Sequence, residues 1–477
     1  MKCVRVLTSA LMALLAPPGA AQEKSALALT HVAVVNVADG SVKPDMTVLV
    51  RGSRIRAVGP TTTVSVPEAA VVVNAAGKFL VPGLWDMHVH SAARVAWHFP
   101  LMVAHGVTGV RNMHTTADTA LELTRSVKRR LATGELIGPR FLANGPIVDG
   151  DPSVWEGAVL VRTPAEARAV VDSLAARGAD FIKVYDNLSR DAYFAIADQA
   201  RRRDIPMVGH VPFRIRPEEA ARAGQRTDEH ASGLSFGCST RADSIRAGSV
   251  RLAGRASSMS FVESLVAGFR LERALYDTRD PSRCAATIDA YRRNGVAVVP
   301  TLVIARNPNY PELVLSDTAS MRFIPEALRR EWEGLAGPGV GDTLRPLLRP
   351  TMRPRLENVK QLNAAGVLIL AGTDLGNPLL VPGVSLHQEL ELLVEAGLTP
   401  LEALRSATLN PARFLAATDS LGTIESGKLA DLVLIEANPL ENIANTRKIA
   451  AVVLDGRYFD RRALDDLLAR TAAEAGR

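Results

Sequence analysis

Six side chains that can bind a metal ion or carry a charge lie in or at the ends of short apolar segments. The segments "GLWDMHVH", "DFIKVYD", "MVGHVP", "TDEHAS" and "LAGTDLG" are each typical of a buried strand. The side chains are His88, His90, Lys183, His210, His230 and Asp374. Neutral imidazoles and a carboxylate suit a divalent ion such as zinc, so the pattern predicts a metal site.

Lys183 is the unusual member of this set, because it lies inside an apolar run between Ile182 and Val184. An ammonium group that is buried without a partner costs several kcal/mol or more, so the lysine needs a reason to be there. One residue-based explanation is a salt bridge to a nearby acid such as Asp186. The other is a role in the metal site itself.

Strand-like and helical segments alternate between residues 79 and 419. Eight such units predict an α/β protein whose main domain is a closed (β/α)8 TIM barrel, with the six side chains near the rim where barrel enzymes place their sites. The segment 307–355 is rich in Pro and Arg and does not resemble a strand. It is predicted to be an insertion that either covers the site as a lid or runs over the surface.

Val-rich segments with Gly and Pro between them occupy residues 22–78 and 420–477. They read as strands at opposite ends of the chain. Their shared character predicts one small composite β-sandwich domain, built from both ends and bracketing the barrel.

Taken together, these motifs resemble the amidohydrolase superfamily, and in detail its imidazolonepropionase-like and Xaa-Pro dipeptidase (prolidase-like) branch. The resemblance rests on "GKFLVPGLWDMHVH", the strand-end residues, "AGTDLG" and "GTIESGKLADLVLIEANPL". It implies that His88, His90 and Asp374 hold one divalent ion, that His210 and His230 hold a second, and that Lys183 bridges both. The lysine would be carboxylated by carbon dioxide, which turns a buried cation into an anionic ligand.

Such a pair of ions, zinc in this reading, supports attack by a metal-bridged hydroxide on a carbonyl carbon. Asp374 is then the predicted general base and the later proton donor to the leaving amine. The resemblance implies an amide substrate, either a dipeptide, an Xaa-Pro peptide or an N-acyl amino acid. Tyr185, His114 and His387 are predicted substrate contacts, with structural packing or hydrogen bonding as the alternative.

Several other functions remain open. The same ligands would serve a cyclic amide (imidazolone or lactam) hydrolase, or a lactone or ester hydrolase. A mononuclear deaminase is disfavoured, because such relatives carry a glutamate where this chain has Phe213 and lack the bridging lysine. A non-catalytic barrel scaffold is disfavoured because no ligand is lost.

Composition and the first residues bear on location and partners. The net charge is +6, but Lys and Arg are interspersed with Asp and Glu, so nucleic-acid binding is not expected. Residues 1–21 have the layout of a secretory signal peptide, which predicts a secreted or periplasmic protein without stable membrane insertion after cleavage. The expected partner is a small-molecule substrate, and the chain could form a homo-oligomer. Cys238 and Cys284 could pair, but their spacing does not decide this.

Overall fold

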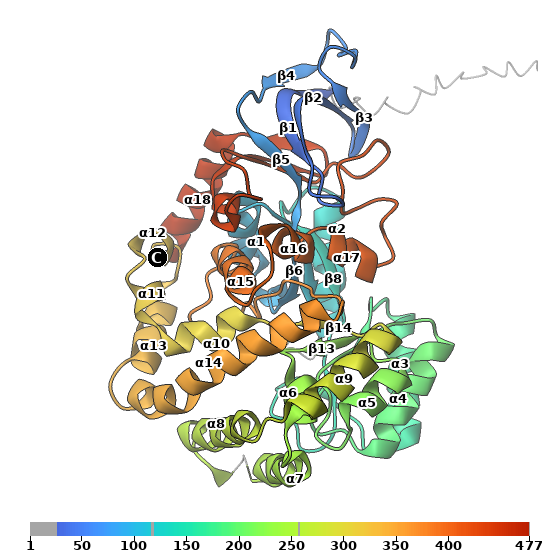
Figure 1. Cartoon of the computed structure of the whole chain (residues 1–477), viewed down its shortest axis with the longest axis vertical. Coiled ribbons are helices and arrows are strands. Elements are labelled where there is room, and N and C mark those ends of the chain that lie inside the picture. The colour runs from blue at the N-terminus through green and yellow to red at the C-terminus, as the bar shows by residue number, and fades with distance from the viewer. Residues whose placement is uncertain (1–25, 116–118, 256–257, 477) are drawn as a thin grey trace, which may run out of the picture.

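The computed structural model describes residues 26–115, 119–255 and 258–476 (Figure 1). The expected signal peptide, residues 1–21, lies outside the described residues. Strands and helices from the middle of the chain form the body of the molecule, and a sheet that contains residues from near both termini covers one end of it (Figure 1). Among the helices described, none is long and apolar enough to cross a membrane.

The sheet at this end has eight strands in the order β17–β16–β15–β5–β1–β2–β3, with β4 paired to β1. Its strands are β1 (Leu27–Val35), β2 (Val42–Arg51), β3 (Arg54–Pro60), β4 (Val71–Asn74), β5 (Phe79–Pro82), β15 (Leu432–Ile435), β16 (Ile449–Leu454) and β17 (Arg457–Phe459). These strands from both ends of the chain are joined by hydrogen bonds into one sheet, and the predicted sandwich packing of the composite domain stays a prediction. The first half of β1 pairs with β4 and its second half with β5. This sheet therefore includes β5, four residues beyond the predicted boundary at residue 78.

Parallel strands form three further sheets in the middle of the chain. They are β6 (Leu84–Val89), β7 (Val107–Asn112) and β8 (Arg140–Ala143); β9 (Val148–Asp149), β10 (Val159–Leu160), β11 (Ile182–Val184) and β12 (Met207–Gly209); and β13 (Thr227–Glu229) and β14 (Ala297–Val299). The chain is thus an α/β protein with mixed sheets, which confirms the predicted α/β class.

Single backbone contacts connect these three parallel sheets. The Asp180 N–H donates to the Ala143 carbonyl (3.0 Å), and the Arg226 N–H donates to the Met207 carbonyl (2.8 Å). Isolated parallel bridges join Val298 to Ile369 and Val89 to Leu375, so the segment 369–375 lies against both β14 and β6. The strands therefore present their carboxyl ends on one side, while the single continuous barrel sheet stays a prediction.

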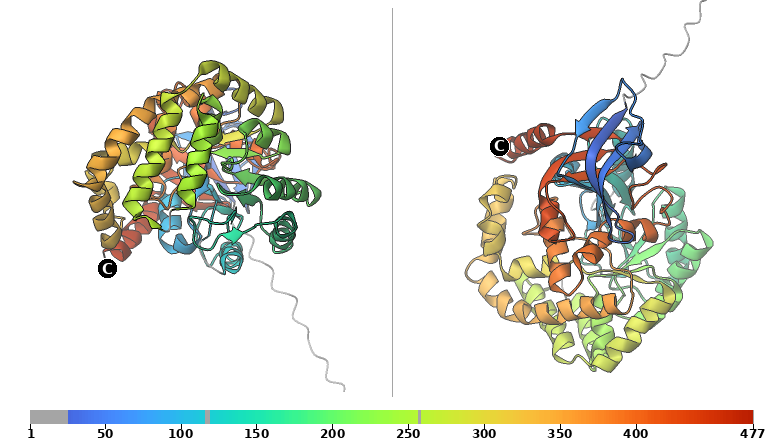
Figure 2. Two further views of the ribbon diagram at one scale, coloured as in Figure 1. Left: turned by 90° about the horizontal axis from the view of Figure 1, so that it is seen from below. Right: turned by 45° about the horizontal axis from the view of Figure 1, so that its top comes forward.

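Helices surround the parallel strands. They are α1 (Val95–Ala104), α2 (Ala120–Ala132), α3 (Pro164–Ala176), α4 (Arg190–Arg202), α5 (Pro217–Ala223), α6 (Ser232–Cys238), α7 (Ala242–Ala253), α8 (Phe261–Asp277), α9 (Pro281–Asn294), α10 (Leu302–Asn309), α11 (Glu312–Leu315), α12 (Thr318–Met321), α13 (Glu326–Ala336), α14 (Val340–Ala364), α15 (Val384–Glu395), α16 (Pro400–Ser406), α17 (Leu409–Phe414) and α18 (Arg461–Ala475). Helix α3 shows why they begin where they do: the Thr163 side chain accepts from the Glu166 N–H, and Pro164 occupies the first turn. Seen from below, α7 and α8 lie side by side (Figure 2).

The segment 307–355 is helical rather than an irregular excursion. It contains the end of α10, all of α11, α12 and α13, and the first part of α14. Three prolines inside α14 are spaced four residues apart, at Pro346, Pro350 and Pro354, so they lie along one face of that helix. Helix α14 lies against α8 and α10 (Figure 1). A lid function for this segment stays a prediction.

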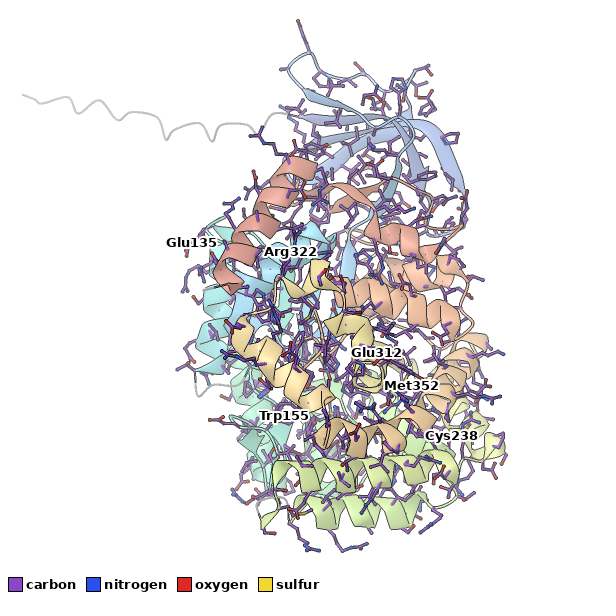
Figure 3. All side chains as sticks on the ribbon, turned by 90° about the vertical axis from the view of Figure 1, so that its left-hand side faces the viewer. Glu135, Trp155, Cys238, Glu312, Arg322 and Met352 are labelled. Carbon is purple, nitrogen blue, oxygen red and sulfur yellow. A yellow bond between two sulfur atoms is a disulfide. The ribbon has the colours of Figure 1, made fainter. Side chains whose placement is uncertain are left out.

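Cys238, which is labelled in Figure 3, forms a disulfide with Cys284. The bond links the last residue of α6 to the first turn of α9. Both cysteines are buried. The pairing that the sequence left open is thereby present in the structure.

Candidate metal centre

His88, His90 and Asp374 form a compact group in which one ligand atom from each residue lies within 4.8 Å of the others. Asp374 Oδ1 is 2.9 Å from His90 Nε2 and 3.3 Å from His88 Nε2. His88 is in β6 and His90 follows its end, so the two-residue spacing places both rings on one face. The sequence prediction that these three residues come together agrees with this geometry.

Asp374 is held by an unusual backbone conformation. Its φ of 63° is in the left-handed region, and its N–H donates to the His88 carbonyl (2.8 Å). Burial on its own would raise the pKa of Asp374, but His88 and the hydrogen bond from His90 outweigh it and hold the pKa below its usual range. Asp374 is therefore an ionised carboxylate that can act as a ligand or accept a proton.

His210 and His230 follow β12 and β13 and complete the cluster. Their ring centroids are 4.9 Å apart, and the His230 ring is 4.8 Å from that of His88. His230 Nε2 lies 4.0 Å from Asp374 Oδ2. Burial lowers the pKa of His230 to about 3 and holds the pKa of His88 and His210 well below the usual range. These imidazoles are thus neutral, which is the form that binds metals.

Three of the histidines are oriented through Nδ1. His88 Nδ1 is hydrogen-bonded to Glu229, His210 Nδ1 to Asp186 and His230 Nδ1 to Thr301, at 2.8, 2.9 and 2.7 Å. Such a bond fixes the tautomer and leaves Nε2 with a free lone pair. Metal-binding histidines usually have their other ring nitrogen hydrogen-bonded in this way. The ligand set is therefore pre-oriented in the protein.

Lys183 lies in β11 with only 1% of its surface exposed, and its Nζ has no hydrogen-bond partner among the described residues. Burial lowers the pKa of Lys183 to about 8, although the negative charges of Glu229 and Asp374 pull the other way. The simpler sequence explanation, a hydrogen-bonded salt bridge to Asp186, is wrong: the Asp186 carboxylate accepts from His210 instead. Among the described residues, the Lys183 amine therefore has no hydrogen-bonded salt bridge that would explain its burial.

Glu229 and Arg111 belong to the site but were not predicted. Arg111 Nη2 donates to Glu229 Oε1 (2.8 Å), and Glu229 Oε2 accepts from His88 Nδ1 (2.8 Å). Both side chains are buried, in β13 and β7. For Arg111 the available signal was the one that singled out Lys183, namely a charged residue inside a largely apolar strand. Glu229 lies in the polar strand Thr227–Glu229 and carried no such signal.

Tyr185 and His114, two of the predicted substrate contacts, lie at the edge of the cluster, and their contact with a substrate stays a prediction. The Tyr185 ring is 4.1 Å from that of His210, and the His114 ring is 6.3 Å from that of His90. Trp155, which the sequence did not single out, stacks on His90 at 6.1 Å with an interplanar angle of 18°. Trp155 lies in the loop between β9 and β10. The site residues were predicted from the ends of strands, and Trp155 is not at such an end.

His387 does not join the cluster. It is buried in α15, where Nδ1 lies 2.9 Å from Thr446 Oγ1 and Nε2 lies 3.0 Å from the backbone oxygen of His105. Both ring nitrogens are used in hydrogen bonds that join α15 to other elements. The predicted substrate contact is therefore corrected to a structural role.

This role predicts an effect of pH on stability. Burial lowers the pKa of His387 to about 3, so the unfolded chain takes up a proton below its ordinary pKa while the folded protein does not. One such group makes the free energy of unfolding fall by up to about 1.4 kcal/mol for each pH unit of acidification. In His387→Gln the free energy of unfolding should decline less steeply on acidification, because about one proton fewer is taken up on unfolding. Urea unfolding from about pH 7 to pH 5 measures this slope. Equal slopes in the two proteins would contradict the structural assignment.

Comparison with solved structures shows a shared fold. The chain superposes on a putative prolidase from Bifidobacterium longum with a TM-score of 0.65 and 24% identity, covering 94% of this chain and 99% of that one. It superposes on a bottromycin amidohydrolase with a TM-score of 0.70 and 23% identity, covering 95% and 92%. A Xaa-Pro dipeptidase with bound methionine gives a TM-score of 0.65 at 20% identity, covering 91% and 100%.

Curated relatives match over shorter stretches. An imidazolonepropionase of Geobacillus kaustophilus (strain HTA426) is 34% identical over 152 residues, 29% of this chain and 34% of that protein. An adenine deaminase of Rubrobacter xylanophilus is 44% identical over 57 residues, 12% of this chain and 9% of that protein. The matched stretches thus span well under two thirds of these relatives.

The family model confirms the resemblance seen in the sequence. The model of the amidohydrolase family, whose members depend on metal ions, matches residues 79–458. This range contains the cluster of His88, His90 and Asp374 together with Lys183, His210 and His230. Because the match covers most of its 477 residues, the chain belongs to the amidohydrolase family.

Proposed function

We propose that this protein is an exported hydrolase with a binuclear metal centre that cleaves the amide bond of a small substrate, such as a dipeptide, an Xaa-Pro peptide or an N-acyl amino acid. The observation that carries the proposal is the Lys183 amine, which is buried without a hydrogen-bond partner in the described chain. Its charge acts on His88, His210 and His230, lowering the pKa of each. In this proposal the three parallel sheets are parts of one (β/α)8 barrel.

The residues fit two divalent ions. His88, His90 and Asp374 would hold one ion, His210 and His230 the other, and carboxylated Lys183 both. The neutral imidazoles of His88, His210 and His230 and the ionised Asp374 are already in the protonation states that ligands need. When bound, two such ions, zinc in this proposal, lower the pKa of water and polarise a carbonyl group.

Lys183 is suited to carboxylation because its pKa is lowered to about 8, which leaves a neutral amine available near neutral pH. The Nζ lone pair forms a bond to the carbon of carbon dioxide, one C–O π bond opens to place its electron pair on oxygen, and Nζ releases a proton to water, giving an anionic carbamate. This replaces an unpartnered cation with an anion among neutral imidazoles. The change supports a role as a ligand to both ions.

Asp374 is the proposed general base. It is ionised and about nine-tenths buried, so it can take a proton from the attacking water and give it to the departing amine nitrogen. Burial holds the pKa of Tyr185 well above its usual range, so its phenol stays protonated and can donate to a substrate oxygen. Trp155, stacked on His90, would exclude water from that side.

Export is supported by the disulfide between Cys238 and Cys284, because such bonds persist in oxidising compartments. The signal-peptide layout of residues 1–21 points the same way. We therefore propose a periplasmic or secreted location.

A cyclic amide is the second candidate substrate. It is supported by the similarity to an imidazolonepropionase, which is 34% identical over 152 residues. The catalytic residues would be the same, since a ring amide and a peptide both present a carbonyl to attack and an amine to protonate. Because the metal ligands would be the same for a linear and a cyclic amide, only assays with both kinds of substrate can distinguish the two candidates.

Removal of metal tests the proposal. The protein is stripped with a chelator, then reloaded with zinc and bicarbonate, and assayed on dipeptides, Xaa-Pro peptides, N-acyl amino acids and a lactam. We expect activity to disappear on stripping, to return on reloading, and to accompany about two bound ions per chain. Full occupancy without hydrolysis of any amide, or hydrolysis that survives stripping, would contradict the proposal.

A further inference from the structure

A cavity of about 360 Å³ opens beside His230, one of the proposed ligands of the second metal ion. Its lining includes His230 and also Asp186, the carboxylate that is hydrogen-bonded to His210. The size falls in the range of small-molecule sites, about 300–1,000 Å³. Its position next to two proposed ligands makes it a place where part of a substrate could lie during reaction.

The cavity is walled by apolar side chains from α6, α7 and α8, which follow β13, and from the loop between β12 and α5. We call it the apolar pocket, and its wall residues are Phe213, Phe236, Ile245, Leu252, Leu271 and Leu275. Helices α7 and α8, which carry four of these residues, lie side by side (Figure 2). Such a wall favours an apolar occupant, because burying apolar surface is favourable while burying an unpaired charge is costly.

Besides Asp186, the pocket is lined by two charged residues, Arg355 and Glu272, which form an ion pair. Arg355 Nη2 donates a hydrogen bond to Glu272 Oε1, and the Arg355 guanidinium lies 5.6 Å from the ring centroid of Tyr276. Both charged residues line the cavity. A substrate carboxylate near Arg355 would also meet the like charge of Glu272, and a substrate cation near Glu272 would also meet the like charge of Arg355. The ion pair therefore works against charged groups of either sign.

We propose that the apolar pocket binds a bulky neutral apolar group, of aromatic side-chain size or larger, on one side of the scissile amide. The proposal rests on the proposed function, whose substrate class it narrows. It makes the pocket walls, rather than the metal ligands, the source of specificity. A small or charged substituent at this position would leave the walls unfilled or the ion pair broken.

The wild-type protein is first tested on Ala-Ala, Phe-Ala and Ala-Phe. One of the two phenylalanine dipeptides should have a kcat/KM at least about tenfold above that of Ala-Ala, since filling an apolar site separates substrates to about that extent. The other should not, because the pocket lies on one side of the amide. Similar kcat/KM values for all three would contradict the proposal.

Filling the pocket is the decisive test. A Cβ at Gly268 in α8 would meet only Leu252 Cδ2, at an ordinary 4.0 Å, so Gly268→Phe can extend into the cavity without a clash at its base. This variant should abolish the preference for phenylalanine, so that kcat/KM for the preferred dipeptide falls by at least about tenfold relative to that for Ala-Ala. Gly268→Leu is a milder version in case the phenylalanine is not accommodated. The matched control is Gly334→Phe in α13, a helical glycine whose Cβ meets nothing within 4 Å and which does not line the pocket.

Substitution in the Arg355–Glu272 ion pair should change the substrate preference in another direction, toward a charged side chain. Glu272→Gln leaves Arg355 without its carboxylate, so a glutamate at the preferred position of the dipeptide should become at least about tenfold better relative to phenylalanine. The double variant Glu272→Gln with Arg355→Met should lose this gain. An unchanged preference in Glu272→Gln would show that the pair does not face the substrate.

A binding measurement separates failure of this inference from failure of the proposed function. N-benzylacetamide, a neutral amide with one aromatic ring, is titrated into metal-stripped protein by calorimetry. Wild type and Gly334→Phe should bind it at least about tenfold more tightly than Gly268→Phe. If no dipeptide is hydrolysed but this difference is found, the pocket stands and the proposed reaction does not. Equal binding in the three proteins would overturn the pocket whatever the activity.

Discussion

Lys183→Met is expected to remove at least one of the two proposed metal ions and to lower kcat/KM by about a thousandfold or more. Methionine has a similar length but cannot be carboxylated, so it would not supply the proposed anionic bridge between the ions. Metal-ion stabilisation of a transition state is worth several kcal/mol, and each 1.4 kcal/mol corresponds to a factor of ten. Metal content per chain and kcat/KM are measured with bicarbonate present, for wild type and variant.

The same substitution should not harm the metal-free protein. The Lys183 ammonium is buried without a hydrogen-bond partner among the described residues, and an apolar side chain removes that cost. The chelated variant should therefore melt at or above the temperature of chelated wild type. Lys360→Met, at an exposed position of α14, is the matched control and should keep both metal content and activity. Two retained ions in Lys183→Met with unchanged activity would contradict the bridging role.

The sequence singled out the clustered histidines and Lys183 because each lies near the carboxyl end of a parallel strand, a position that local pattern reveals. That they bind metal stays a prediction. The same reasoning misplaced His387, which also follows a strand-like segment. Which way a helical side chain faces depends on what the helix packs against, and α15 directs His387 toward Thr446. Trp155 was missed for a related reason, since it reaches His90 from a loop with no periodic pattern.

Long-range pairing explains the remaining differences. That β1 pairs along its length with β4 and then with β5 cannot be read from either segment alone, so the order of the strands in the composite domain was not predicted. The apolar pocket combines α7 and α8 with Arg355 of α14, about eighty residues further along the chain. Each contributing helix has an ordinary amphipathic pattern. Only the fold reveals that their apolar side chains face a shared cavity next to His230.

Arg111→Met is expected to lower the free energy of unfolding by about 3–5 kcal/mol, because it leaves Glu229 as a buried charge without its cation. Arg111 and Glu229 are 1% and 0% exposed, and the guanidinium donates to both carboxylate oxygens, at 2.8 and 3.0 Å. Burial would raise the pKa of Glu229, but Arg111 and Lys183 together hold it below its usual range. Without Arg111 that pKa rises, so the loss of stability should shrink as the pH is lowered and the carboxyl takes up a proton. Urea unfolding of the chelated protein at two pH values measures both effects.

The double variant Arg111→Met with Glu229→Leu separates stability from metal binding. Replacing both members of a buried ion pair by apolar groups is often neutral or stabilising, so most of the lost stability should return. Metal affinity should not return, because His88 Nδ1 loses the carboxylate that fixes its tautomer. Loss of such a partner typically costs 10–100-fold in affinity. A double variant that recovers stability and also binds metal like wild type would show that Glu229 serves the fold alone. Recovery of stability without recovery of affinity would place the Arg111–Glu229 pair in the metal site, where it positions His88.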